Sequence, residues 1–177
     1  SKSANSEIGD DFFARYELTD SDVQKAVLNN LDAKFLILKM QQEMLFSDDD
    51  SFATIQTLLL DLVSYNQTRY IGVEPEWVGV LSELLNDSWS EQLSLPELAT
   101  LANVHPVTIS RYFRRYFNST LGEYRRKLKV DKSISLVKDQ ELSLTEIAFI
   151  CGFADQSHFT RNFKQITGFL PNEFRRL

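Results

Sequence analysis

Apolar and polar positions alternate with the period of an α-helix through the first half of the chain. Apolar residues recur every three or four positions from Thr19 or Ser21 to about Phe46. The same spacing returns in residues 52–70 and in residues 75–89. No stretch in this half alternates at every second residue, as a half-buried strand would, so we predict three helices.

The second of these segments is more apolar than a helix that covers a core on one side requires. It contains the run LLLDLV at residues 58–63. Two interpretations stay open: the three helices cover one another within one chain, or the stripe in 52–63 forms the seam of a homodimer. The candidate seam consists of Phe52, Ile55, Leu59 and Leu62.

The second half of the chain contains two copies of one pattern. LSLPELATLANV at 93–104 matches LSLTEIAFICGF at 142–153, with an offset of 49 residues. EYRR at 123–126 matches EFRR at 173–176 with an offset of 50, so the second copy has one extra residue in its turn. Two copies are too few for a solenoid, and they indicate two versions of one supersecondary unit.

Each copy predicts a short helix, a tight turn and a second helix. The turn falls at Asn103 and at Gly152, two residue types that tolerate the left-handed backbone conformation. The first helix begins with a capping box, made by Ser94 with Glu97 and by Ser143 with Glu146. The apolar anchors of the second helix are Ile109, Phe113 and Phe117 in one copy and Phe159, Phe163 and Ile166 in the other. This succession is the helix-turn-helix pattern.

A helix-turn-helix places its second helix in the major groove of DNA, so the outward residues of that helix are the candidate contacts. Arginine can bind guanine and glutamine can bind adenine with two hydrogen bonds each. The predicted base contacts are Val107, Ser110 and Arg111 in the first copy and Gln156, Ser157, Thr160 and Arg161 in the second. The predicted phosphate contacts are Arg114, Arg115, Arg125, Arg126 and Lys164. The alternative for any one of them is a solvated side chain on an exposed face.

The charge of the chain is divided unequally between its halves. The net charge of −6 combines 6 basic and 17 acidic residues in 1–93, a net −11, with 13 basic and 8 acidic residues in 94–177, a net +5. This asymmetry suggests that only the second half meets a polyanion. On charge alone, the basic residues could equally solvate exposed helix faces.

The sequence offers little chemistry for an enzyme or a metal site. Cys151 is the only cysteine, and His105 and His158 are the only histidines, so paired zinc-binding cysteines are excluded. Cys151 as a nucleophile with His158 as its base is the rival hypothesis. Cys151 falls on the buried side of its predicted helix, so we predict no enzyme, no metal and no cofactor. No apolar run reaches the roughly 18 residues of a membrane span, and we expect a cytoplasmic protein.

The second copy, IAFICGFADQSHFTRNFKQITGFLPNEFRR, resembles the signature of the AraC/XylS family of bacterial transcription regulators. The matching positions are Ile147, Ala148, Gly152, Phe153, Phe159, Arg161, Phe163, Lys164, Gly168, Pro171, Phe174 and Arg175. The resemblance implies an all-α fold, in which residues 93–177 form a tandem helix-turn-helix domain that binds double-stranded DNA. Its units would lie at about 94–117 and 143–167, joined by a helix at roughly 121–138. The two recognition helices would enter consecutive major grooves.

The first copy departs from the family pattern at several positions. Asn103 and Asn118 stand where glycine is common, and His105 stands where a serine cap is usual. These departures leave the base preference of the first helix open.

Residues 1–92 resemble only the helical region that precedes the DNA-binding domain in this family. We expect an acidic helical region there that dimerises, and we expect the family's small-molecule sensor to be absent, so the effector stays unknown. The prediction is a sequence-specific DNA-binding transcription regulator. The alternative is a helical protein-interaction module with a repurposed helix-turn-helix domain, which would have lost the outward polar and basic residues.

Overall fold

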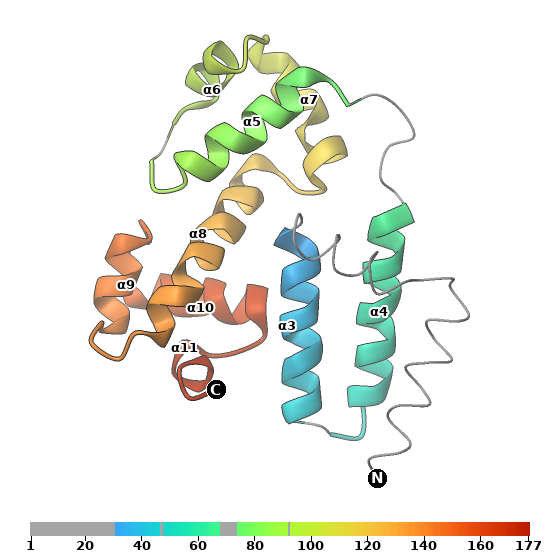
Figure 1. Cartoon of the computed structure of the whole chain (residues 1–177), viewed down its shortest axis with the longest axis vertical. Coiled ribbons are helices and arrows are strands. Elements are labelled where there is room, and N and C mark those ends of the chain that lie inside the picture. The colour runs from blue at the N-terminus through green and yellow to red at the C-terminus, as the bar shows by residue number, and fades with distance from the viewer. Residues whose placement is uncertain (1–30, 47, 68–73, 92) are drawn as a thin grey trace. The chain divides into compact units, whose positions relative to one another are not determined.

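The computed structural model describes residues 31–46, 48–67, 74–91 and 93–177, together with the backbone but not the side chains of 63–67. Within these residues all regular secondary structure is helical, which confirms the predicted all-α fold (Figure 1). No helix among them is long and apolar enough to cross a membrane. The chain divides into two compact units, one ending at residue 69 and the other beginning at residue 70.

The first unit contains two helices, α3 (Leu31–Leu45) and α4 (Ser51–Gln67), which lie side by side and run in opposite directions (Figure 1). Their contact is centred on buried Ala33 and Leu62, with Leu36 and Met40 packed against that pair. The predicted starts of the first helix, at Thr19 or Ser21, lie outside the described residues.

The apolar stripe of α4 is only partly covered within its own unit. Leu62 is buried, Ile55 and Leu59 are half-buried, and Phe52 is 61% exposed. Leu62 therefore belongs to the core between α3 and α4, while Phe52 remains accessible. A dimer seam along this stripe stays a prediction.

The third predicted helix is α5 (Glu76–Asp87), and it belongs to the second unit. Val78, Leu81 and Leu85 of α5 are buried, and α5 contacts the helix that follows it. The ring of Trp77 meets the ring of Tyr116 edge to face, with centroids 5.5 Å apart. In sequence α5 falls within the predicted acidic region 1–92, yet it packs on the first repeat.

The two repeats form the predicted helix pairs. The first contains α6 (Leu95–Leu101) and α7 (Pro106–Phe117), and the second contains α9 (Leu144–Ile150) and α10 (Gln156–Thr167). The joining helix α8 spans Leu121–Lys138, as predicted, and α11 (Pro171–Phe174) follows the second repeat. Figure 1 shows α8 running from the group of α5, α6 and α7 to the group of α9, α10 and α11.

Both predicted capping boxes form. Ser94 and Ser143 each accept a hydrogen bond from the backbone of the glutamate three residues on, and that glutamate accepts one in return from the serine backbone. The hydrogen bonds from the serines hold the pKa values of Glu97 and Glu146 below their ordinary value. A third box, Thr120 with Glu123, begins α8.

The left-handed residues recur at equivalent places in the two repeats. Asn103 and Gly152 form the turns between the paired helices, with φ of 51° and 67°. Asn118 and Gly168 end the recognition helices, with φ of 50° and 89°. Asparagine tolerates this conformation better than other residues with a side chain, which explains why the first repeat keeps its fold without the family's glycines.

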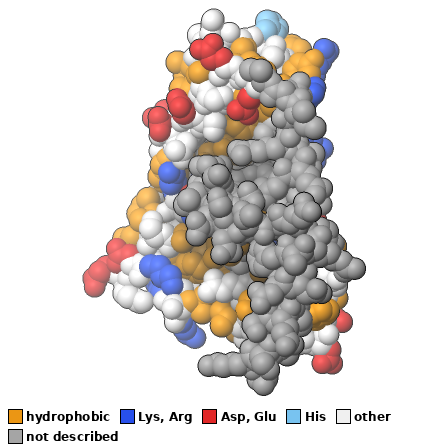
Figure 2. Space-filling view, turned by 45° about the vertical axis from the view of Figure 1, so that its right-hand side comes forward, with side chains coloured by type: hydrophobic (Ala, Val, Ile, Leu, Met, Phe, Trp, Pro, Cys, Tyr) orange, Lys and Arg blue, Asp and Glu red, His pale blue; other side chains and the backbone are white. Residues whose placement is uncertain are grey.

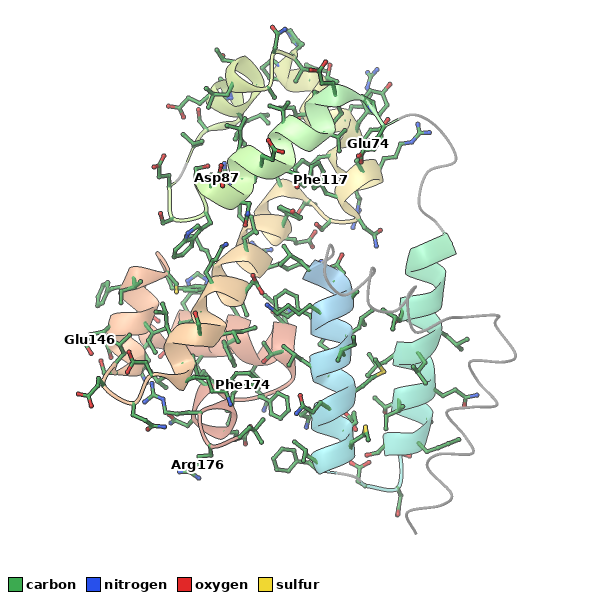
Figure 3. All side chains as sticks on the ribbon, in the orientation of Figure 1. Glu74, Asp87, Phe117, Glu146, Phe174 and Arg176 are labelled. Atoms are coloured by element: carbon green, nitrogen blue, oxygen red, sulfur yellow. The ribbon has the colours of Figure 1, made fainter. Side chains whose placement is uncertain are left out.

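The core of each repeat is built from the predicted anchors with one exception. Ile109, Phe113 and Phe117 are buried on α7, and Phe159 and Phe163 are buried on α10. Figure 3 shows Phe117 in the first repeat and Phe174 of α11 beside the second.

The exception is the last anchor of the second repeat, where Thr167 is fully buried and Ile166 is only half-buried. The hydroxyl of Thr167 donates to the carbonyl of Phe163 at 2.7 Å and accepts from the amide of Phe169 at 3.2 Å. These local bonds satisfy the buried hydroxyl, so a threonine can occupy the place of Phe117. The prediction that Ile166 is the equivalent anchor was therefore wrong.

Candidate nucleic-acid interface

One face of α7 carries the outward residues predicted for the first repeat. Ser110 and Arg111 lie three and four residues after Val107, and Arg114 lies four and three residues after them, so the four residues share one side of the helix. All four are exposed, Val107 to 54%. The buried Ile109 lies on the opposite side, which turns this row of polar and small side chains away from the core.

α10 presents a corresponding face. Gln156, Ser157, Arg161 and Lys164 are exposed, whereas Thr160 is half-buried. The Nε of Arg161 donates to the carbonyl of Ser157 at 3.3 Å, so the side chain lies along its own helix in the free protein. The structure therefore brings together, on one helix face, the residues predicted to contact bases in the second repeat.

The two recognition helices begin with different caps. At α10, the carboxylate of Asp155 accepts from the backbone amide of His158 at 2.6 Å. At α7, Nδ1 of His105 accepts from the backbone amide of Val107 at 3.2 Å, and Pro106 is the first helical residue. His105 thus caps the helix as a serine would, and the first recognition helix starts at the place expected for it.

Most of the predicted phosphate contacts are accessible. Arg114 and Arg115 lie in the last turn of α7, Lys164 lies in the last turn of α10, and Arg126 is exposed on α8. Arg125 differs because it is half-buried and its Nη2 donates to the carbonyl of Leu93. Burial lowers the pKa of Arg125 from its ordinary value. Arg125 therefore forms a hydrogen bond within the fold, and its contact with a phosphate stays an untested prediction.

An equivalent arginine fastens the second repeat. Nε of Arg175 donates to the carbonyl of Val137 at 2.9 Å, and its Nη2 donates to the carbonyl of Leu142 at 2.7 Å. Leu93 and Leu142 each directly precede the serine that caps the first helix of a repeat. The signal for this role was present in the matching EYRR and EFRR segments, but only the fold shows which carbonyls the arginines reach.

One contact on the recognition face was not predicted from the sequence. The hydroxyl of Thr145, near the start of α9, donates to Oε1 of Gln156 at 2.8 Å. An exposed threonine in the first turn of a helix has no pattern that marks it as a partner of a residue on the next helix. Thr145 is therefore a candidate site residue that the sequence prediction missed.

Comparison with known proteins places this arrangement in a family. Residues 98–177 match the family model described as a helix-turn-helix domain. The chain is 29% identical over 92 residues to the HTH-type transcriptional regulator GbdR of Pseudomonas aeruginosa, covering 52% of this chain and 25% of GbdR. A crystal structure from Chromobacterium violaceum, described as a transcriptional regulator of the AraC-type DNA-binding domain-containing proteins, superposes with a TM-score of 0.53 at 22% identity, over 56% of this chain and 89% of that one. The C-terminal half carries an AraC/XylS-type DNA-binding domain.

One relative matches a longer stretch of the chain than the AraC/XylS-type domain. The HTH-type transcriptional activator RhaS of Escherichia fergusonii is 27% identical over 144 residues, which cover 79% of this chain and 52% of RhaS. The chain thus spans a quarter of the length of GbdR and about half of RhaS.

On the face that Figure 2 shows, the charged side chains of the described residues are dispersed. In the space-filling view of Figure 2, basic side chains lie in small groups between apolar and neutral ones, and acidic side chains share that face. Three basic residues, Arg111, Arg114 and Arg115, lie close together on α7.

The thiol in the AraC/XylS-type domain is poorly suited to nucleophilic chemistry. Cys151 is fully buried. Burial raises its pKa to about 11, only partly offset by the charge of Lys129. Lys129 itself donates to the carbonyl of Gly152 at 2.7 Å, and so it supports the turn beside this cysteine. Among the residues that the structure describes, no three His, Cys, Asp or Glu side chains gather as metal ligands would.

Proposed function

We propose that the chain is a transcription regulator whose residues 93–177 bind double-stranded DNA with sequence preference. The observation that carries the proposal is the repeated recognition face. Arg111 and Arg161 occupy equivalent positions on α7 and α10, and both are exposed. An exposed arginine at the same place in both repeats of an AraC/XylS-type domain is better explained by a common ligand than by chance.

The two recognition helices would enter consecutive major grooves on one side of the duplex, about 34 Å apart. The joining helix α8 has 18 residues and is therefore about 27 Å long at 1.5 Å per residue. This length is comparable to the groove spacing, and a rigid helix is suited to hold the two recognition helices at a fixed separation. Arg111 and Arg161 would bind guanine edges, with Val107, Ser110, Ser157 and Thr160 beside them.

Arg114, Arg115, Lys164 and Arg126 would contact phosphates, and these contacts would supply most of the affinity. The regulatory role draws support from GbdR and RhaS, which are described as a transcriptional regulator and a transcriptional activator. Homodimerisation would use the accessible part of the α4 stripe around Phe52. A cytoplasmic location follows from the same role.

The alternative function is a protein-interaction module built on the same helices. The outward polar and basic residues of α7 and α10 count against it, since a module that no longer binds DNA has no need to keep them. The two functions differ in how strongly salt lowers the affinity for DNA.

Salt-dependent binding of the full chain to mixed-sequence duplex DNA tests the proposal. We expect affinity to fall steeply as salt rises, and Arg126→Ala to weaken binding to all sequences alike and reduce the slope by about one, because one phosphate contact is lost. Glu91→Gln, a change at an exposed acidic residue before α6, is the control for altered net charge. No binding at low salt would contradict the proposal, and a sequence-selective loss in Arg126→Ala would contradict the phosphate assignment.

A further inference from the structure

The contact between Thr145 and Gln156 joins the two helices of the second repeat on their solvent side. Thr145 is the second residue of α9 and Gln156 is the first residue of α10. The threonine hydroxyl donates to the amide oxygen of Gln156 at 2.8 Å, and both side chains are exposed. In a helix-turn-helix the first helix crosses the DNA backbone while the start of the second contacts base edges, so this pair lies where the two meet.

The fold does not need this bond. The start of α9 is capped by Ser143 with Glu146, and the start of α10 is capped by Asp155. A neutral hydrogen bond on the surface adds little net stability because water competes for both groups. Its main effect is on the glutamine side chain, which would otherwise sample many rotamers at the beginning of the recognition helix.

The first repeat lacks the pair. The position equivalent to Thr145 is Pro96 and the position equivalent to Gln156 is Pro106, by the offsets of 49 and 50 residues that relate the repeats. Neither proline has a side chain that can form such a bond. The contact is therefore a difference between two otherwise matching units, and it lies at a position predicted to contact bases.

We propose that Thr145 is a positioning residue that fixes how Gln156 contacts DNA. The inference rests on the proposed DNA-binding function. By holding the amide oxygen of Gln156 toward α9, Thr145 turns the amide nitrogen toward the groove. Gln156 then donates to an acceptor on a base edge, which is N7 of a purine, O6 of guanine or O4 of thymine.

This orientation changes the base preference expected for a glutamine. Binding adenine with two hydrogen bonds requires the amide oxygen to accept from the adenine amino group while the nitrogen donates to N7. Thr145 already occupies one lone pair of that oxygen and fixes the amide plane. A bond arranged before binding also reduces the ordering cost when the complex forms.

Selection of bound duplexes from a random pool by the full chain and its variants tests the inference. Gln156→Ala identifies the base pair that Gln156 contacts, because preference changes there. At that base pair, Thr145→Val should lower the discrimination between bases about threefold to tenfold, because one neutral hydrogen bond contributes about that much to binding. Thr145→Ser should retain the wild-type preference, and Thr145→Val should have no further effect in a Gln156→Ala background.

Thr100→Val is the matched control. Thr100 is an exposed threonine on α6 whose hydroxyl donates to the carbonyl of Pro96 at 3.0 Å, within its own helix. Its replacement should leave the preference unchanged. The inference is wrong if Thr145→Val keeps the wild-type preference or weakens all sequences alike, as loss of a phosphate contact would. If the wild-type chain enriches no sequence, the proposed function fails, and the inference fails with it.

Discussion

At the scale of single residues, Arg125 and Arg175 each hold the start of one repeat in place. Each donates to the backbone carbonyl just before the capping serine of its repeat. A carbonyl at this position lies outside the hydrogen-bond ladder of the helix and needs a partner. The planar guanidinium of Arg175 reaches two carbonyls at once, on Val137 and Leu142, and so ties the end of α8 to the start of the second repeat.

Replacing Arg175 should therefore destabilise the domain. We expect Arg175→Ala to lower the free energy of unfolding by about 1.5–3 kcal/mol, the range for hydrogen bonds made by a charged group. Arg175→Lys should recover little, because an ammonium group lacks the fork that spans two carbonyls. The measurement is urea unfolding followed by far-ultraviolet circular dichroism.

The neighbouring Arg176 provides the control for this change. It is exposed, and Figure 3 labels it beside α11 in the second unit. Arg176→Ala should stay within about 0.5 kcal/mol of the wild type. Equal unfolding midpoints for the Arg175 and Arg176 variants would show that the two carbonyl contacts do not stabilise the fold.

The residue scale also shows what the sequence could predict about the site. Exposure of Arg111 and Arg161 followed from helical spacing, because the apolar anchors fix which side of each helix faces the core. The role of Arg125 did not follow, since a basic residue on a helix looks the same in sequence whether it meets solvent or a carbonyl. The partner of Gln156 was likewise hidden, because Thr145 lies eleven residues away across a turn.

At the scale of elements, the turns decide where each recognition helix begins. Asn103 and Gly152 both have a left-handed backbone, which costs an ordinary residue about 1–2 kcal/mol. A Cβ atom added at Gly152 would also lie 2.9 Å from Nζ of Lys129. That atom is the end of a flexible side chain, so the backbone conformation is the larger cost.

Substitutions at these two turn residues should affect stability differently. Gly152→Ala should lower the free energy of unfolding by about 1–2 kcal/mol, and Asn103→Gly should leave it unchanged or slightly higher, because glycine adopts this conformation freely. Differential scanning calorimetry of the two variants measures both changes.

Gly79→Ala on α5 is the control for a glycine without such a constraint. A Cβ atom there meets nothing within 4 Å, and glycine is a poor residue inside a helix. This variant should gain about 0.5–1 kcal/mol. A loss at Gly79 equal to that at Gly152 would show that the turn conformation is not the cause.

Element boundaries were predicted well where local chemistry marks them. The span of α8 followed from the family resemblance and is fixed at its start by Thr120 and Glu123. The sequence prediction missed that Thr167, and not Ile166, occupies the buried position. Hydrophobicity alone does not predict a buried threonine whose hydroxyl is hydrogen-bonded locally. The beginning of the first predicted helix lies outside the described residues.

At the scale of the molecule, α5 alters the division of the chain that the sequence suggested. Charge and the repeat placed a boundary near residue 93, whereas α5 packs with α6 and, through Trp77, with Tyr116. Packing of this kind depends on which apolar faces meet, and periodicity identifies a face without identifying its partner. The functional boundary at residue 93 remains a prediction.

The central claim is that the two repeats contact DNA as separate units held at a fixed distance. Selection of duplexes from a random pool by the full chain should yield two half-motifs about 10 base pairs apart. Arg161→Ala should relax one base pair in one half-motif, and Arg111→Ala one base pair in the other, each at a cost of about 1–3 kcal/mol in binding. A single motif that both variants weaken together, or enrichment of no motif, would contradict the account.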